Sequence, residues 1–212
     1  MAVGVVLIIV VLVVVVVGYF ARHQAPPLRA RFLRRVGFAV MVLFGGFFGL
    51  FLIGETLSDP GGWKGIGLVA LWAVPLAIVC LLAWLRPDAA GWLFAFLTAA
   101  VIGLSIWSAV DPTGWRSLEN HSGPIRAVAV FTLAAALAVW GLRRTAQAGV
   151  MLVVIGVLPV LISSTVHNGM ASLAAASSAP VVTGLLYLAS VYVDRRQPPS
   201  LASGSSERPE AA

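Results

Sequence analysis

Residues 2–20 read AVGVVLIIVVLVVVVVGYF, a run of nineteen positions that holds no charged side chain. At 1.5 Å of rise per residue, a helix of that length matches the hydrocarbon core of a bilayer, which is about 30 Å thick. No basic region precedes the run, it exceeds the apolar part of a secretory signal peptide, and no A-x-A-like cleavage site follows. We therefore expect residues 1–20 to form a retained signal-anchor transmembrane helix.

The rest of the chain repeats this pattern. Further apolar runs, each of about 18–22 residues as a membrane span requires, cover residues 36–57, 66–85, 92–110, 125–142, 149–166 and 172–193. The chain is 60% hydrophobic and only 10% charged, whereas a soluble domain carries about 25% charged residues. Helices that are apolar on every side leave no face for water, which excludes an ordinary soluble fold. We expect an all-α, polytopic transmembrane bundle of about seven helices, of which residues 36–193 supply six.

The basic residues predict the orientation of these helices. With the N-terminus outside, 11 of the 14 Lys and Arg residues fall on the inner side, and inner loops are enriched in both residue types. The strongest determinant is the connection at 21–35, ARHQAPPLRARFLRR. We therefore expect an N-out/C-in protein of the bacterial cytoplasmic membrane, with 21–35 in the cytoplasm. Residues 194–212 are rich in Pro, Ser and Glu and lack apolar periodicity, which predicts a disordered cytoplasmic tail.

The same basic connection could also attract lipid. Arg29, Arg31, Arg34 and Arg35 lie within seven residues of one another, and each arginine near an anionic membrane surface contributes about 1 kcal/mol of attraction. Control of orientation alone explains these arginines, so we favour it over a specific lipid or protein docking role. The net charge of +6 is interpreted in the same way, and no nucleic-acid partner is expected.

A short motif occurs twice and indicates an internal duplication. Residues 59–64 read DPGGWK and residues 111–116 read DPTGWR. Each copy begins a unit of outer turn, helix, basic inner turn and helix, which predicts a tandem two-helix repeat over 59–110 and 111–166. Many secondary transporters use inverted repeats instead. A tandem repeat therefore makes a transporter a less favoured interpretation.

The motif itself has a structural explanation. The aspartate can accept backbone N–H groups, and the proline fixes φ in the turn. Trp63 and Trp115 suit the membrane interface, and Lys64 and Arg116 can extend to water. We therefore expect these four residues to be interfacial anchors rather than parts of a ligand site.

Ionisable residues inside a membrane are the first candidates for function. Glu55, near the outer end of its predicted span, is the main one, and Arg126 is its expected partner in a structural ion pair. The candidate polar cluster of the outer face comprises Glu55, Asp59, Asp111, Glu119, His121, Arg126 and His167. Its spacing matches no metal-ligand motif, so we expect no metal site. No cofactor is expected either, because haem between helices usually needs paired histidines inside the bundle.

The chain resembles a known group of proteins in four segments. These are DPGGWK at 59–64, LWAVPL at 71–76, LRPDAAG at 85–91 and DPTGWR at 111–116. With these segments the chain looks like uncharacterised multipass membrane proteins of high-G+C bacteria, over about residues 40–190. The resemblance implies a multi-pass membrane protein and transfers no catalytic residue.

Three functions are compatible with the sequence. The leading hypothesis is a non-enzymatic scaffold or accessory membrane subunit, whose partners are the bilayer and an unidentified membrane protein. A small-molecule permease is the alternative, because Pro75, Pro159 and Pro180 can kink their helices around a cavity. A membrane enzyme acting on lipid would require the outer-face cluster to converge.

Small residues such as Gly45 and Gly49, in small-xxx-small spacing, predict close helix packing.

Overall fold

The computed structural model describes residues 2–24, 26–56, 58, 62–122, 125–164 and 170–196. Its helices are α1 (Ala2–Arg22), α2 (Pro26–Thr56), α3 (Gly62–Leu85), α4 (Pro87–Val110), α5 (Pro112–Ser122), α6 (Ile125–Gly141), α7 (Thr145–Ser164) and α8 (Met170–Arg196). The predicted all-α class is confirmed, and each predicted apolar run lies on one helix to within a few residues.

Several of these helices have the length of a membrane span. Among the described residues, α2, α3, α4, α7 and α8 are long and apolar enough to cross a bilayer, which makes five candidates. The pair α5 and α6 adds a sixth if the two count as one span bent by 78°. Of α1, the stretch Val11–Arg22 is recognised as a shorter apolar helix.

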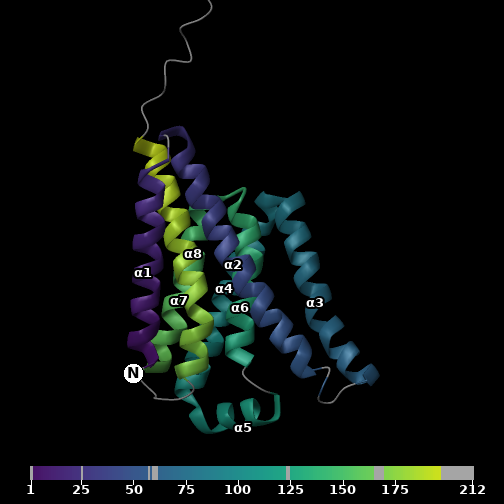
Figure 1. The fold of residues 1–212 in the computed structure, drawn as a ribbon. Helices are drawn as coiled ribbons and strands as arrows, with labels where there is room; N and C mark the ends of the chain where they lie inside the picture. Colours follow the sequence, from purple (N-terminus) through teal and green to yellow (C-terminus); the bar gives the residue numbers. More distant parts are fainter. Residues whose placement is uncertain are drawn as a thin grey trace, which may run out of the picture.

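The helices form a bundle with one loosely attached member (Figure 1). The most extensive packing joins α7 to α8, and α8 also packs on α2 and α1. Helix α3 lies at the edge of the bundle and contacts mainly α6 (Figure 1). Helix α5 lies across the end of the bundle where α1 begins. The core therefore lies around α6, α7 and α8, and α3 has most of its surface outside it.

Large aromatic side chains fill the core on the α6 side. Trp140 and Tyr187 are fully buried, and each uses its polar atom: Trp140 Nε1 donates to Pro87 O at 2.8 Å, and Tyr187 Oη donates to Ala138 O at 2.8 Å. Gly141 lies directly against the ring of Tyr187, where an added Cβ would collide with it. Buried aromatics whose polar atoms are bonded in this way fix the spacing of α4, α6 and α8.

Glycines allow the closest approach between two helices, α7 and α8. They are not Gly45 and Gly49, for which the sequence predicted close helix packing. A Cβ added to Gly184 of α8 would lie 2.9 Å from the carbonyl oxygen of Gly149 on α7, so these two backbones nearly touch. By contrast, a Cβ added to Gly45 or Gly49 of α2 would meet the side chains of Phe131 or Trp72 at 3.7 and 3.6 Å. Gly45 and Gly49 therefore make room for aromatic rings instead of another backbone.

The first connection is shorter than expected. The whole segment 21–35 was predicted as a cytoplasmic connection, yet α1 continues to Arg22 and α2 begins at Pro26. A proline pair opens α2, and proline suits the first turn of a helix because no N–H is needed there. The arginines that follow continue the same helix, and Arg34 pairs with Asp194 of α8 at 3.3 Å. Helix α8 likewise extends to Arg196, past the predicted start of the tail at 194, and the remaining tail lies outside the described residues.

Helix α1 packs on the bundle rather than only facing lipid. Ala21 of α1 is buried in a small cluster with Leu33 of α2 and with Val182 and Leu186 of α8. Its opposite side remains exposed, for example at Val15, which is 62% exposed. One face of this nearly uniform apolar helix is therefore a protein contact, although its sequence does not distinguish the two faces.

Candidate functional site

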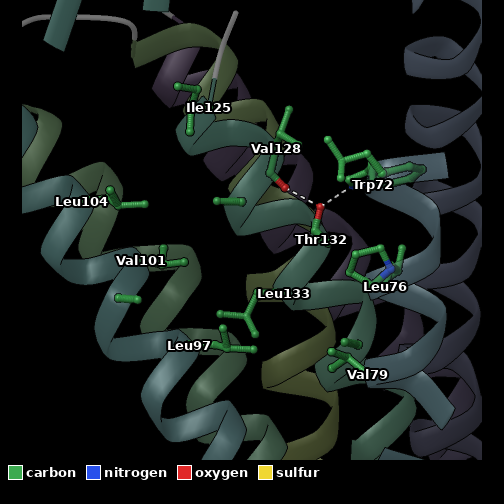
Figure 2. A pocket seen from close by; sticks show the side chains of 15 residues that line it. Trp72, Leu76, Val79, Leu97, Val101, Leu104, Ile125, Val128, Thr132 and Leu133 are labelled. Carbon is green, nitrogen blue, oxygen red and sulfur yellow. Dashed lines mark hydrogen bonds between the residues drawn. The ribbon is translucent and has the colours of Figure 1, made fainter. Parts of the chain in front are cut away.

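An apolar groove lies between α3, α4 and α6 and encloses about 550 Å³. Figure 2 shows side chains of α4 on one side of the groove, those of α3 on the other, and those of α6 between them. The residues that shape it include Trp72, Pro75 and Leu76 of α3, Leu97, Val101 and Leu104 of α4, and Val128, Thr132 and Leu133 of α6. The groove exists because α3 stands away from α4 and meets the bundle mainly through α6.

A single tryptophan connects α3 to α6 at the groove. Trp72 Nε1 donates a hydrogen bond to Thr132 Oγ1 at 2.8 Å, and that hydroxyl donates to Val128 O at 2.7 Å. The two contacts are drawn in Figure 2. One turn further along α3, Pro75 has no N–H to offer the carbonyl of Leu71, which loosens the helix where it lines the groove. The indole of Trp72 thus bridges α3 and α6, and the groove opens beside it.

The chemistry of the groove is that of a hydrocarbon site. Apart from Thr132, its lining side chains are alkyl or aromatic, and the polar atoms of Trp72 and Thr132 already bond to each other and to a backbone oxygen. A polar solute in this groove would lose hydration without gaining a partner from these side chains. A hydrocarbon chain is therefore the ligand whose polarity matches the groove.

A buried arginine joins four helices near the end of the bundle that carries α5. Arg126 of α6 is 5% exposed, and its Nη1 donates to Ser108 Oγ of α4 at 2.8 Å and to Ser163 Oγ of α7 at 2.9 Å. Its Nε faces Glu119 Oε1 of α5 at 3.4 Å. The sequence predicted Glu55 as the partner, but Glu55 is exposed and takes part in no ion pair among the described residues. That partner assignment is wrong, because the bend between α5 and α6 brings Glu119 back over Arg126.

Trp115 completes this arrangement. Its ring centroid lies 5.3 Å from Arg126 Cζ and 5.3 Å from the ring of Trp107, and Trp115 is only 2% exposed. Trp63, expected to be its equivalent, is 87% exposed. The two tryptophans of the repeated motif therefore occupy different environments: Trp115 of α5 is buried against Arg126 and Trp107, and Trp63 is exposed at the start of α3.

The second copy of the motif starts a helix, not a simple turn. Asp111 Oδ1 accepts the Gly114 N–H at 3.0 Å and the Thr113 hydroxyl at 2.9 Å, which is the arrangement of a helix N-cap before α5. These two bonds, the Gly114 N–H first, lower the pKa of the Asp111 carboxyl below its ordinary value. In the first copy, Gly62 has φ +56° and begins α3 directly. The second unit thus has an additional helix.

The structure joins only part of the predicted outer-face cluster. Glu119 and Arg126 pair, and Asp111 caps the helix that carries Glu119. Lys64 is exposed on the first turn of α3, and Arg116 is exposed on α5. Asp59 and His167 lie outside the described residues, and the side chain of His121 does too. Within the described ranges, no three His, Cys, Asp or Glu residues are grouped as metal ligands would be.

Of the groove residues, the sequence pointed only to Pro75, and it indicated neither Trp72 nor Thr132. Trp72 and Thr132 are 60 residues apart, and neither interrupts the apolar character of its run. The sequence did contain one indication of this contact, because a tryptophan and a threonine in the middle of apolar helices each need a hydrogen-bond partner. The sequence does not say which residue supplies it.

Comparisons of the chain with protein-family models, curated proteins and solved structures find no match. The fold and the groove therefore define its class. Over the residues that the structure describes, it is an all-helical bundle with five helices of the length and apolarity of membrane spans, which is the character of a multi-pass membrane protein. Its particular role follows from what the groove and the buried arginine can do.

Proposed function

We propose that the chain is a seven-span protein of the bacterial cytoplasmic membrane, with its N-terminus outside and its C-terminus inside. The spans are α1, α2, α3, α4, α6, α7 and α8, and α5 rests on the outer surface. Support comes from the two ends of the bundle in Figure 1. The arginines around the α1–α2 connection, the α6–α7 turn and the end of α8 belong to one end, while Lys64, Arg116 and Arg126 belong to the other. A basic inner side is the usual arrangement.

Within that topology the protein is a non-enzymatic accessory subunit that holds the hydrocarbon chain of a membrane lipid in the groove beside α3. The observation that carries this proposal is the bonded pair Trp72–Thr132 in an otherwise apolar wall, because it leaves those side chains no donor for a polar ligand. Sites of about 300–1,000 Å³ typically hold one small molecule or cofactor, and the volume of about 550 Å³ falls in that range.

The buried arginine has a structural role in this proposal. Its guanidinium links α6 to α4, α5 and α7 through Ser108, Glu119 and Ser163. A charge held by several hydrogen bonds and an acidic partner stabilises one arrangement of helices. This arrangement favours an accessory protein over an enzyme at the outer face. A permease for polar solutes is less favoured because such a solute would cross the apolar groove without its hydration.

The tandem duplication remains part of the proposal. The unit 59–110 contains α3 and α4, and the unit 111–166 contains α5, α6 and α7. Support comes from the motif residues, which begin α3 in one unit and α5 in the other, at the same end of the bundle in Figure 1. The additional helix α5 would then be an insertion in the second unit.

The groove can be tested with photoreactive lipid and two neighbouring alanines of α4. Ala99 and Ala100 are both exposed, but only Ala100 lines the groove. The full chain, in vesicles containing a phospholipid with a diazirine in one acyl chain, should show adducts on groove-lining peptides of α3 and α6. Ala100→Trp should fill the groove and abolish them, whereas Ala99→Trp should keep them. Equal labelling of the two variants would show that the groove has no lipid of its own, and the proposal would fail.

A further inference from the structure

A second pocket, of about 380 Å³, lies between α4, α6 and α7 at the end of the bundle opposite α5. Its rim is polar and consists of Asp88, Arg144 and Gln147. Its wall is apolar and includes Trp92, Ala95 and Met151. Ala95 follows Asp88 by seven residues on α4, and Met151 follows Arg144 by seven residues, so each lies about 10 Å deeper along its helix.

Trp140 lines this pocket and is held in place by its hydrogen bond to Pro87 O at 2.8 Å and by the ring of Phe94, whose centroid lies 5.3 Å from its own. A Cβ added to Gly91 would lie 3.3 Å from Trp140 Cζ2, so the glycine leaves the space above the indole open. Trp92 is 84% exposed at the side of the pocket, and tryptophan is enriched at the depth of lipid headgroups.

The charges at the rim favour an anion. Arg144 pairs with Asp88, but the two side chains are 48% and 79% exposed, and such exposed pairs are weak. Arg86, which directly precedes α4, belongs to the same end of the bundle, so Arg86 and Arg144 together outnumber the single carboxylate of the rim. Helices α4 and α7 also begin here, and α4 has no side-chain cap. The positive ends of both helices add to the attraction for a negative group.

We propose that this pocket binds an anionic phospholipid of the bilayer. The phosphate ion-pairs with Arg144 in place of Asp88 and accepts a hydrogen bond from the Gln147 amide. One acyl chain lies along Trp92, Ala95 and Met151. The polar rim above an apolar wall matches a lipid, whereas a free anion would use only the rim. This site is separate from the groove beside α3 and does not depend on it.

The test uses the detergent-solubilised full chain and native mass spectrometry. Phosphatidylglycerol and phosphatidylcholine with identical chains are compared, and phosphatidylglycerol should bind more tightly. Arg144→Gln should weaken phosphatidylglycerol binding about fivefold, the equivalent of the attraction of one arginine. Asp88→Asn should strengthen it, because it removes the competing carboxylate. This opposite sign separates a loss of binding from a loss of folding.

Arg143→Gln is the matched control. Arg143 lies in the same turn and carries the same charge, but its guanidinium lies over the ring of Trp84 at 4.6 Å and does not line the pocket. Binding by this variant should equal that of the unchanged protein. The proposal is overturned by any of three results: equal losses in Arg143→Gln and Arg144→Gln, equal binding of the two lipids, or displacement of the lipid by an equal concentration of inorganic phosphate.

Discussion

Trp72 Nε1 lies 2.8 Å from Thr132 Oγ1, and this hydrogen bond connects the outlying helix α3 to α6 at the edge of the groove. Because α3 meets the bundle mainly through α6, we expect this bond to govern how firmly α3 is held. Trp72→Phe and Thr132→Val should each destabilise the protein by about 1 kcal/mol, the usual net contribution of a hydrogen bond. The double variant should cost less than the sum of the two, in thermal unfolding and in hydrogen exchange of α3. Strict additivity would mean that the bond does not couple the helices.

Replacing Arg126, which joins four helices, should destabilise the protein. Arg126→Gln removes charge-assisted bonds to Ser108, Ser163 and Glu119, and we expect a loss of about 2 kcal/mol or more in the free energy of unfolding. Glu55→Gln is the control, because Glu55 is exposed and should change stability by less than about 0.5 kcal/mol. Denaturant unfolding in detergent measures both. Similar losses of stability in the two variants would indicate that Glu55 is a structural partner of Arg126 after all.

A methyl group on Gly141 should disturb the core. The added Cβ of Gly141→Ala would collide with the ring of Tyr187, whose hydroxyl is fixed on Ala138 O. Forcing an atom into such a core typically costs 1–3 kcal/mol. Gly103→Ala in α4 is the matched change, since nothing lies within 4 Å of its added Cβ, and it should be neutral or slightly stabilising. Melting temperatures in detergent should differ accordingly, and equal melting temperatures would contradict this packing.

The cap of α5 should respond to acid. The pKa of Asp111 is lowered in the folded protein, so its contribution to stability is present above the unfolded pKa of about 3.9 and is lost as the pH falls through the folded value. Asp111→Asn keeps a capping side chain and should remove this pH dependence, whereas Asp111→Ala should weaken α5 at neutral pH as well. Thermal unfolding from about pH 5 down to about pH 2 covers the unfolded pKa and the lower folded one, and it compares the three proteins. If Asp111→Asn still loses stability at low pH as the unchanged protein does, another group causes that loss.

The orientation can be tested by thiol labelling in a Cys80→Ser background. A cysteine at position 23, between α1 and α2, should resist a membrane-impermeant reagent in intact cells and react after lysis. A cysteine in place of Thr113, which is exposed on α5, should react in intact cells. The reverse pattern would invert the proposed topology.

Local structure in this protein follows from the sequence. Apolar runs long enough to cross a bilayer must satisfy their own backbone hydrogen bonds, and a helix does so within one segment. For that reason every predicted run coincides with a helix. The helix that was missed, α5, is polar and short, but Asp111 and Pro112 carried the signal of a cap followed by a proline at the first helical position. The signal was interpreted as a turn.

Tertiary structure alone decided which residues meet. The helices are apolar on nearly every side, so their sequence periodicity does not identify the face that packs. Only the 78° bend between α5 and α6 places Glu119, rather than Glu55, on Arg126. Only the position of α3 brings Trp72 to Thr132 and leaves the groove beside them. The sequence thus determined the helices and which of their ends carry basic residues. Both candidate sites depend instead on the distances between helices, and side-chain packing in the folded protein sets those distances.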